Sequence, residues 1–287
     1  MGSCQDAFPR SEAIEPEVGT ELAGTVTRLR AAGCVFAEEE ARLLVAAAQT
    51  SGDLSALVER RAAGLPLEQV LGWAEFCGLR IAVEPEVFVP RRRTELLVRQ
   101  AAPLVQRAAA QRPDRGASSA LPVLVDLCCG SGAVGAALAA AGMVEWYAVD
   151  IDPAAVHCAR RNAAATGGRV YEGDLYDPLP STLRGRVDVL VANAPYVPTE
   201  ALGLMPAEAR LYEPRVALDG GEDGLETQRR VTSAAPRWLA PGGHLLVETS
   251  ASQAQATVEI FTRSGLVAQV ASSEALDATV VIGSLNR

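Results

Sequence analysis

The chain of 287 residues is long enough for one large domain and a smaller one, and 49% of its residues are apolar, so a packed core is expected. The net charge of −9 argues against a protein that grips nucleic acid, because Lys and Arg side chains must replace the counterions of the phosphate backbone. No apolar stretch approaches the length that spans a bilayer, and the polar, acidic N-terminus lacks the pattern of a secretory signal. We therefore expect neither stable nucleic-acid binding nor a membrane segment.

The start of the chain is predicted to be helical after a disordered leader over residues 1–20. Apolar residues recur at helical spacing over 21–50, and a further helix is expected over 53–63. Together these elements predict a small helical N-terminal domain over 21–75.

Two β-rich runs follow, on either side of Glu84 and Pro85, and predict a hairpin over 76–93 that links two domains. Residues 94–110 have helical spacing again. The stretch 111–122 is rich in Pro, Gly and Ser and is typical of a loop.

From residue 122 onward, apolar runs with strand character alternate with helical stretches. The continuous apolar runs are typical of strands buried in a parallel sheet, and they cover residues 123–127, 146–150, 169–173, 187–193 and 244–249. Helical patterns lie between them. This alternation predicts an α/β domain with a doubly wound sheet over residues 94–287.

The first of these runs leads into a glycine-rich turn, DLCCGSGAVG. Asp126 ends the strand, and Gly130, Gly132 and Gly135 open the next helix, where glycine lets the backbone approach a ligand without a Cβ in the way. The turn does not fit the dinucleotide pattern G-x-G-x-x-G, because Cys128 occupies the first glycine position. An acidic residue before the turn can hold the ammonium group of an amino acid, which a dinucleotide lacks.

Two further acidic residues follow the next strands. Asp150 stands 18 residues after Gly132, at the place where a carboxylate accepts hydrogen bonds from a ribose. Asp174 is placed to accept a hydrogen bond from an adenine amino group, with Leu175 packing on the ring. Each Asp taken singly can also be a helix cap or a turn residue. Acids at three successive strand ends instead predict an adenosyl ligand that carries an amino-acid tail, S-adenosylmethionine.

The six cysteines form no CxxC pair, and the chain has only two histidines, His157 and His244, so no metal site is predicted. The simplest expectation for such a cysteine pattern is a reduced protein in the cytosol. We also expect a monomer.

The quartet Asn193, Ala194, Pro195 and Tyr196 comes directly after the apolar run 187–193. Asn-x-Pro can be simple turn punctuation after a strand. Strand ends in open α/β sheets are also where ligands bind. The quartet is therefore a candidate catalytic motif.

At this point the sequence resembles the HemK/PrmC class of protein-(glutamine N5) methyltransferases, from about residue 21 to the end. The segments that carry the resemblance are RRAAGLPLEQVLGWAEFCGLRIAV, VFVPRRRTELLV, LYEPRVALDGGEDGLETQRRV and LAPGGHLLVETSASQ. Enzymes of this class use S-adenosylmethionine to methylate the Gln of the Gly-Gly-Gln loop in peptide chain release factors. The resemblance implies a class I methyltransferase fold, a Rossmann-like sheet preceded by a small helical domain and a hairpin.

The resemblance also implies roles for individual residues. The expected catalytic and substrate-binding residues are Asn193, Ala194, Pro195 and Tyr196, and Arg91 is added to the substrate side. The Asn193 side chain and the carbonyl of Ala194 would accept the two N–H donors of the substrate amide. The residues expected to bind the cofactor are Asp126, Cys128, Cys129, Gly130, Ser131, Gly132, Asp150, Ile151, Asp174, Leu175 and Asn193.

The chain departs from the class at two places. The quartet of the class is Asn-Pro-Pro-Tyr, whereas position 194 is Ala here, and a Pro-Glu pair of the class is replaced by Arg92 and Arg93. The departures suggest a divergent branch, in which the chemistry is more secure than the release-factor substrate. The departure at Ala194 leaves its backbone carbonyl in place, so we expect a looser but competent site.

Three other functions remain open from the sequence. A nucleic-acid amino methyltransferase uses a similar quartet on a flipped base, although the acidic charge counts against it. A small-molecule N-methyltransferase would use Arg92 and Arg93 to recognise a carboxylate. A scaffold that binds the cofactor without turnover is the third.

Overall fold

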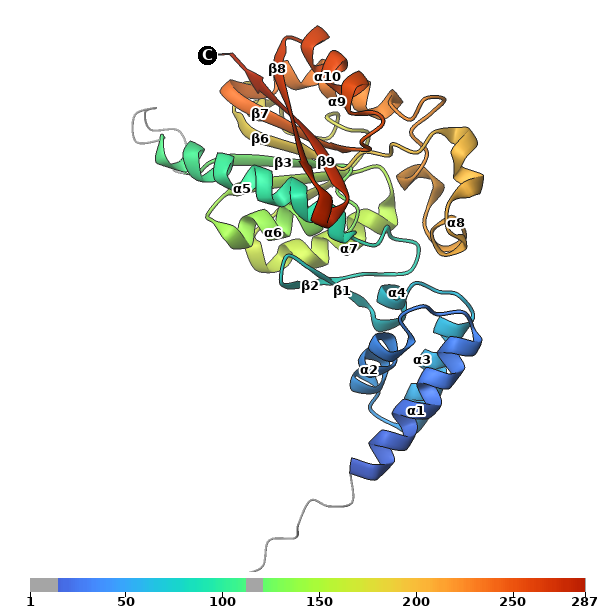
Figure 1. Cartoon of the computed structure of the whole chain (residues 1–287). Coiled ribbons are helices and arrows are strands. Elements are labelled where there is room, and N and C mark those ends of the chain that lie inside the picture. The colour runs from blue at the N-terminus through green and yellow to red at the C-terminus, as the bar shows by residue number, and fades with distance from the viewer. Residues whose placement is uncertain (1–14, 112–120, 287) are drawn as a thin grey trace, which may run out of the picture. The chain divides into compact units, whose positions relative to one another are not determined.

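A computed structural model of the chain describes residues 15–111 and 121–286 (Figure 1). It divides into two compact units, one that ends at Leu71 and one that begins at Gly72. Most of the predicted leader and of the loop over 111–122 lies outside the described residues. The last residues of the predicted leader are helical and not disordered, since α1 spans Glu15–Ala31. Pro16 is compatible with this start, because the first turn of a helix needs no N–H donor at that position.

The first unit is a small helical domain. Leu29, Leu44 and Val58 are buried at its centre. The side chain of Thr50 caps the third helix by accepting a hydrogen bond from the backbone N–H of Asp53 at 3.1 Å. The remaining helices of this unit are α2 Ala37–Ala47, α3 Ser51–Ala62 and α4 Leu67–Leu71.

The hairpin lies earlier in the chain than the sequence predicts. Strand β1, Trp73–Phe76, pairs antiparallel with β2, Leu79–Ala82, so the turn is at Cys77–Gly78 and not at Glu84–Pro85. Both turn residues have positive φ, 50° and 75°, which is the backbone geometry that suits a two-residue hairpin turn. In the sequence, Glu84–Pro85 is the stronger turn signal, whereas the turn of the hairpin forms at Cys77–Gly78.

The second unit contains a seven-stranded sheet in the order β5-β4-β3-β6-β7-β9-β8. Strand β9 runs antiparallel to both of its neighbours, β7 and β8. The predicted doubly wound α/β fold is confirmed, although the last two strands were not predicted and β7 begins before residue 244. The strands are β3 Val123–Leu127, β4 Glu145–Asp150, β5 Arg169–Glu172, β6 Val187–Ala192, β7 Leu239–Thr249, β8 Leu266–Ser273 and β9 Ala278–Leu285.

Helices cover both faces of this sheet, as Figure 1 shows. One face packs against α5 Glu95–Ala110, α6 Ala133–Ala141 and α7 Pro153–Ala163. The other face packs against α9 Glu226–Ala234 and α10 Ala254–Arg263. The short helix α8, Ala207–Tyr212, belongs to the long connection between β6 and β7.

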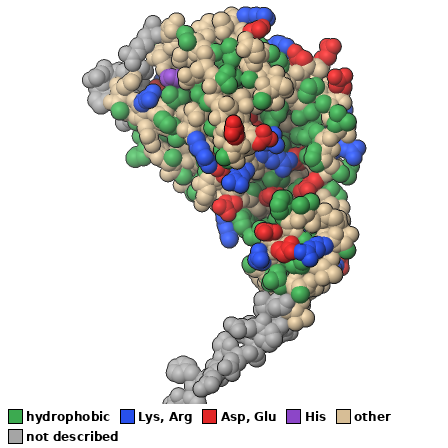
Figure 2. Space-filling view, in the orientation of Figure 1, with side chains coloured by type: hydrophobic (Ala, Val, Ile, Leu, Met, Phe, Trp, Pro, Cys, Tyr) green, Lys and Arg blue, Asp and Glu red, His purple; other side chains and the backbone are tan. Residues whose placement is uncertain are grey.

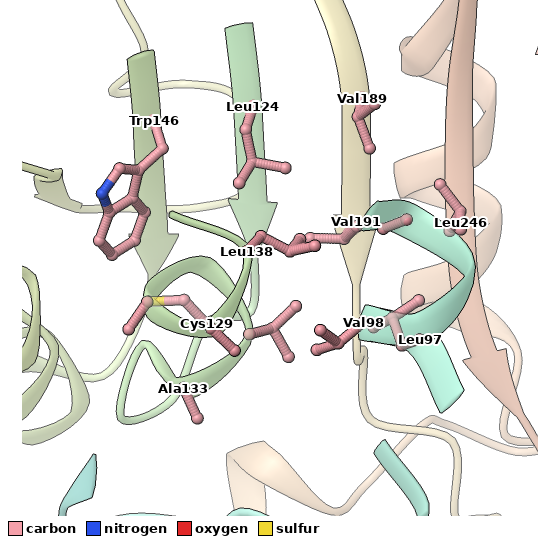
Figure 3. Packing of buried hydrophobic residues seen from close by; sticks show 14 of the residues in the cluster. Leu97, Val98, Leu124, Cys129, Ala133, Leu138, Trp146, Val189, Val191 and Leu246 are labelled. Atoms are coloured by element: carbon pink, nitrogen blue, oxygen red, sulfur yellow. The ribbon is translucent and has the colours of Figure 1, made fainter. Parts of the chain in front are cut away.

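The core follows the alternation of strand side chains. In β6, Val189 and Val191 face the α5–α6 layer, whereas Leu190 faces the α9–α10 layer. Both layers are apolar, which is why the central strands read as continuous apolar runs. Figure 3 shows the first layer, in which strand residues point toward helical residues; among those labelled are Leu97, Leu124, Leu138, Trp146, Val189, Val191 and Leu246.

Gly135 gives a test of this packing. A Cβ at Gly135 would overlap the ring of Trp146, which is 1% exposed and has no room to move. We expect Gly135→Ala to lower the free energy of unfolding by about 1–3 kcal/mol, or roughly 2–4 °C of melting temperature per kcal/mol for a domain of this size. The measurement is thermal unfolding followed by circular dichroism.

Gly142→Ala is the matched control at the end of the same helix. No atom lies within 4 Å of a Cβ there, and φ is −180°, which any residue adopts. Equal melting temperatures for the two variants would contradict the packing described for Gly135.

Candidate active site

The predicted site residues gather at one edge of the sheet. Strands β3, β4, β5, β6 and β7 run parallel, so their carboxyl ends meet at the same edge. Asp126, Asp150 and Asn193 belong to the ends of three of these strands. The two halves of this edge differ in chemistry, with acids and glycines at β3 and β4 and the quartet at β6.

The turn after β3 is built for close approach. Cys128, Gly130 and Gly132 all have positive φ, between 53° and 75°. A Cβ at Gly132 would press on Ala159 of α7 at 3.2 Å, whereas one at Gly130 would meet nothing within 4 Å. The backbone at Gly130 is therefore open on the side where a side chain would project, and a ligand can reach it there.

Asp150 ties this turn to the neighbouring strand ends. Its carboxylate accepts hydrogen bonds from the backbone N–H of Gly130 at 2.8 Å and of Asp152 at 3.0 Å. Its own carbonyl accepts from the N–H of Gly173 at 2.9 Å. Burial raises the pKa of Asp150, and the two backbone N–H groups oppose that rise. A carboxylate has about four lone-pair sites, so capacity for a ligand remains. The next residue, Ile151, is 52% exposed.

Asp126 is a buried acid without a nearby base. It is 2% exposed, and its Oδ2 accepts a hydrogen bond from the N–H of Gly135 at 2.9 Å. Burial raises the pKa of Asp126 to about 7, and the charge of Asp150 adds to the rise. Within the described residues, no cation is among the groups that shift this pKa. A ligand with an ammonium group would supply the missing positive charge.

Asp174 and Leu175 lie beside the turn, and Asp174 already has a partner. Its carboxylate forms an ion pair with Arg230 of α9 at 2.6 Å. The charge of Asp174 raises the pKa of the Cys128 thiol in addition to the larger effect of burial, which places it near the turn. Leu175 is half-buried against the core. Both residues border the site, but adenine would have to share Asp174 with Arg230.

The other two turn residues predicted to bind the cofactor, Cys129 and Ser131, are buried. The carbonyl of Ser131 accepts a hydrogen bond from Asn162 at 2.8 Å. These residues support the turn through the backbone. The turn, the rigid Asp150 carboxylate and the unpaired Asp126 together fit an adenosyl ligand that ends in an amino acid.

The quartet follows β6 directly. The Nδ2 of Asn193 donates a hydrogen bond to Oγ1 of Thr94 at 3.3 Å. Ala194 is 1% exposed, so its methyl group is packed although the proline ring of the class is missing. Pro195 is half-buried.

Tyr196 is held from several directions. Its hydroxyl donates to Oε1 of Glu248 at 3.4 Å, and its carbonyl accepts from Nε2 of Gln253 at 3.0 Å. The next residue, Val197, forms an isolated β-bridge with Asp219. Burial raises the pKa of Tyr196 to about 12, and the charge of Glu248 adds to this. Tyr196 therefore anchors its loop to the end of β7.

Two residues that sequence reasoning did not select, Thr94 and Glu248, complete this half of the site. Glu248 is 2% exposed at the end of β7, and within the described part of the chain its Oε2 has no hydrogen-bond partner. Burial raises the pKa of Glu248, whereas the neighbouring Thr94 hydroxyl and Arg93 guanidinium oppose the rise. Arg93 also lowers the pKa of Tyr196. The available signal was the position of Glu248 at a parallel strand end, the same signal that selected the aspartates.

Arg91, predicted on the substrate side, is held by the protein itself. Its Nη2 lies 2.6 Å from Oε2 of Glu213, whose side chain is fully buried, and its guanidinium lies over the Phe88 ring, 5.0 Å from the centroid. Glu213 also accepts from the N–H of Val89 at 3.1 Å. The guanidinium of Arg91 thus braces the segment before α5, and Arg93 is the arginine beside the quartet.

On the face drawn in Figure 2, acidic and basic side chains are interspersed and form no single basic area. In the described ranges, no group of three or more His, Cys, Asp or Glu side chains could hold a metal ion. No helix within those ranges is long and apolar enough to cross a membrane.

Comparisons with known proteins identify related methyltransferases. A family model for the methyltransferase small domain matches residues 117–221. The release factor glutamine methyltransferase of Geobacter sulfurreducens is 41% identical over 212 residues, which cover 73% of this chain and 69% of that protein. The 4-amino-L-phenylalanine/4-methylamino-L-phenylalanine methyltransferase of Streptomyces pristinaespiralis is 37% identical over 209 residues, which cover 72% and 69%.

Among solved structures, a methyltransferase from Pyrococcus furiosus has a TM-score of 0.53 at 17% identity and covers 80% of this chain and 100% of that one. A likeness at this identity supports the fold alone, and it confirms the predicted class I methyltransferase fold. Identity of 41% over two thirds of a curated enzyme shows more than fold. This chain is an S-adenosylmethionine-dependent methyltransferase, and it belongs to the family of release factor glutamine methyltransferases.

Proposed function

We propose that the protein methylates the side-chain amide nitrogen of a glutamine in a peptide chain release factor. The observation that carries this proposal is the Asn193 side chain, which follows β6 and has its Nδ2 bonded to Thr94. In that orientation Oδ1 is the free acceptor. The relative in Geobacter sulfurreducens, named for this activity, supports the choice of substrate.

An amide nitrogen is a poor nucleophile because its lone pair is delocalised into the carbonyl. Two acceptors that take its two N–H donors hold it in line and stabilise the positive charge that develops as the lone pair is drawn out. Asn193 Oδ1 would be one acceptor and the carbonyl of Ala194 the other. No strong base is needed at the moment of transfer.

The residues at β3 and β4 would hold the cofactor, which when bound supplies an electrophilic methyl group on a sulfonium sulfur. Asp126 would pair with its ammonium group and Asp150 would accept hydrogen bonds from its ribose hydroxyls. Ile151 and Leu175 would pack on the adenine, and Asp174 would accept from the adenine amino group. Gly130 and Gly132 would let the backbone approach closely.

Ala194 is compatible with this chemistry. The acceptor at this position is a backbone carbonyl, which any residue provides. The buried methyl group of Ala194 and the anchoring of Tyr196 by Gln253 and Glu248 restrain the loop where the first proline of the class would. The ring of Tyr196 would restrict rotation of the substrate side chain.

The cytosolic setting, the monomeric state and the lack of stable nucleic-acid binding are part of the same proposal. The net charge of −9 supports the last of these. Cys77, Cys128, Cys129 and Cys158 are free thiols, which suits a reducing compartment.

The main test is transfer of labelled methyl from S-adenosylmethionine to a purified release factor, with the labelled residue mapped by mass spectrometry. Asn193→Ala should lower kcat by about 100-fold or more, because one of two preorganised acceptors is lost. Thermal unfolding followed by circular dichroism is the control for folding. A folded Asn193→Ala variant with near wild-type kcat would refute the mechanism, and absence of label from glutamine would refute the substrate.

Asp126 predicts a pH dependence of cofactor binding. Its pKa of about 7 means that the acid becomes neutral as the pH falls through 7 and then loses its attraction for an ammonium group. The dissociation constant for S-adenosylmethionine should therefore rise by up to about tenfold per pH unit below pH 7. Asp126→Asn should weaken binding at pH 8 by roughly 10- to 100-fold and remove most of this dependence. Titration calorimetry at pH 6 and pH 8 measures both effects, and equal pH dependence in the variant would reject the assignment.

A second candidate is a free amine that carries a carboxylate, such as an amino acid. Two observations favour it: a relative named for 4-amino-L-phenylalanine at 37% identity, and the cation Arg93 beside Tyr196 and Glu248 where the class has an acid. The quartet would grip an amine as it would an amide.

Arg93→Gln separates the two candidates, with Arg92→Gln as the matched control on the adjacent exposed arginine. If a free amino acid is the acceptor, Arg93→Gln should raise its KM by about tenfold or more, since a charge-assisted contact is lost. With a release factor as the acceptor, its KM should stay within about threefold of wild type in both variants, because the reacting glutamine brings no carboxylate to Arg93. Any loss in Arg93→Gln should then fall on kcat, since the Arg93 charge favours the ionised form of Glu248. The assay offers 4-amino-L-phenylalanine and release factor to each variant in parallel.

A further inference from the structure

Three polar side chains from different elements lie close together at the quartet. Thr94 ends the short 3-10 turn that precedes α5, Asn193 follows β6, and Glu248 ends β7. Thr94 is 3% exposed and Glu248 is 2% exposed. Thr94 accepts from Asn193 Nδ2 at 3.3 Å and neighbours the Glu248 carboxyl group. A buried carboxyl oxygen without a partner, as Oε2 of Glu248 is among the described residues, calls for an explanation.

We propose that Thr94 and Glu248 are positioning residues that determine which way the Asn193 carboxamide faces. The inference rests on the proposed function, in which Oδ1 of Asn193 accepts from the substrate. The oxygen and nitrogen ends of a carboxamide have nearly the same size and shape, so packing alone does not choose between them. A chemical asymmetry in the surroundings has to make the choice.

The asymmetry begins at Glu248. An ionised carboxylate only accepts hydrogen bonds, so under this proposal the Thr94 hydroxyl directs its proton toward Glu248, whose Oε2 is the oxygen left without a partner among the described residues. The side of Thr94 Oγ1 that faces Asn193 then offers lone pairs alone, and only the N–H end of the carboxamide can bond there. Oδ1 of Asn193 is left to face the acceptor amide.

Burial raises the pKa of Glu248, and the groups around it oppose this rise in favour of the ionised state. Arg93 supplies a positive charge that favours the ionised carboxylate, and Tyr196 donates its hydroxyl to Oε1. Were Glu248 neutral, its own proton would compete for the Thr94 oxygen, and the carboxamide would lose its fixed orientation. The ordinary alternative is that the three side chains only fasten α5 to the sheet.

A double-mutant cycle distinguishes the two interpretations. Thr94→Val keeps the shape but removes the hydroxyl, and Thr94→Ser restores it. We expect Thr94→Val to lower kcat for release-factor methylation by about 10- to 100-fold with KM for S-adenosylmethionine within about threefold, since a displaced reacting group costs that much. Thr94→Ser should stay within about threefold of wild type. In an Asn193→Ala background, Thr94→Val should cost less than about threefold, because its target is absent.

An equally large loss of kcat in the Asn193→Ala background would overturn the inference, and so would a folded Thr94→Val variant with wild-type kcat. Thermal unfolding and calorimetric cofactor binding establish folding for each variant, and Thr94→Ala replaces Thr94→Val if the latter does not fold. Glu248→Met, which keeps the length of the side chain without an acceptor, should lower kcat to a similar degree and should not add to Thr94→Val.

A measurement without any substrate separates this inference from the proposed function. The side-chain amide signal of Asn193 in a proton–nitrogen NMR spectrum is identified by its loss in Asn193→Ala. It should exchange slowly with water in the wild type and in Thr94→Ser, and about tenfold faster or more in Thr94→Val, because its bond partner is gone. Unchanged exchange in Thr94→Val would refute the positioning role even if no release factor is methylated.

Discussion

The hydrogen bonds around Asp150 are the contacts on which the cofactor half of the site depends. Its carboxylate binds the backbone of Gly130 and Asp152, and its carbonyl binds that of Gly173, so one residue joins the ends of β3, β4 and β5. A glycine turn with three positive φ values has little stiffness of its own. Asp150 supplies that stiffness while keeping lone pairs for a ligand, and this is why a buried acid is tolerated at a strand end.

The acceptor half of the edge is held together by side chains. Asn193 is bonded to the buried Thr94, and Tyr196 to the buried Glu248. Hydrogen bonds to buried groups are stronger and more costly to lose than those on the surface. Because β6 lies between β3 and β7 in the sheet, the two halves share the same rigid platform. The carboxamide of the substrate can then be held close to the methyl donor, because no mobile segment connects the two halves of the site.

Most of the sheet and several site residues could be predicted from the sequence, and the physical reasons for this also explain which elements and contacts could not. Buried parallel strands show as apolar runs, and a ligand at their ends requires polar residues there, so Asp126, Asp150 and Asn193 were visible. Strand β8 lies at the edge with alternating exposure, so its pattern is weak, whereas β9 is buried over residues 278–283 and its apolar run could have been identified. Thr94 and the partners of Arg91 and Asp174 depend on which segments meet in space, as Thr94 and Asn193 do across 99 positions. A contact between residues so far apart in the sequence leaves no local sequence pattern.

The division between buried and exposed groups bears on how one site could serve different acceptors. The groups proposed to bind an N–H donor, Asn193 and the carbonyl of Ala194, require only an amine or amide and do not select the molecule that carries it. Identities near 40% join this chain both to an enzyme named for a release factor and to one named for a free amino acid. The choice of acceptor must then lie with residues at the rim, where a substitution leaves the buried contacts intact. Arg93 is such a residue: it is exposed, yet its charge reaches Tyr196 and Glu248. Under the proposed function, a change of sign at that one position would alter which acceptor is favoured, while the backbone of the quartet stays the same.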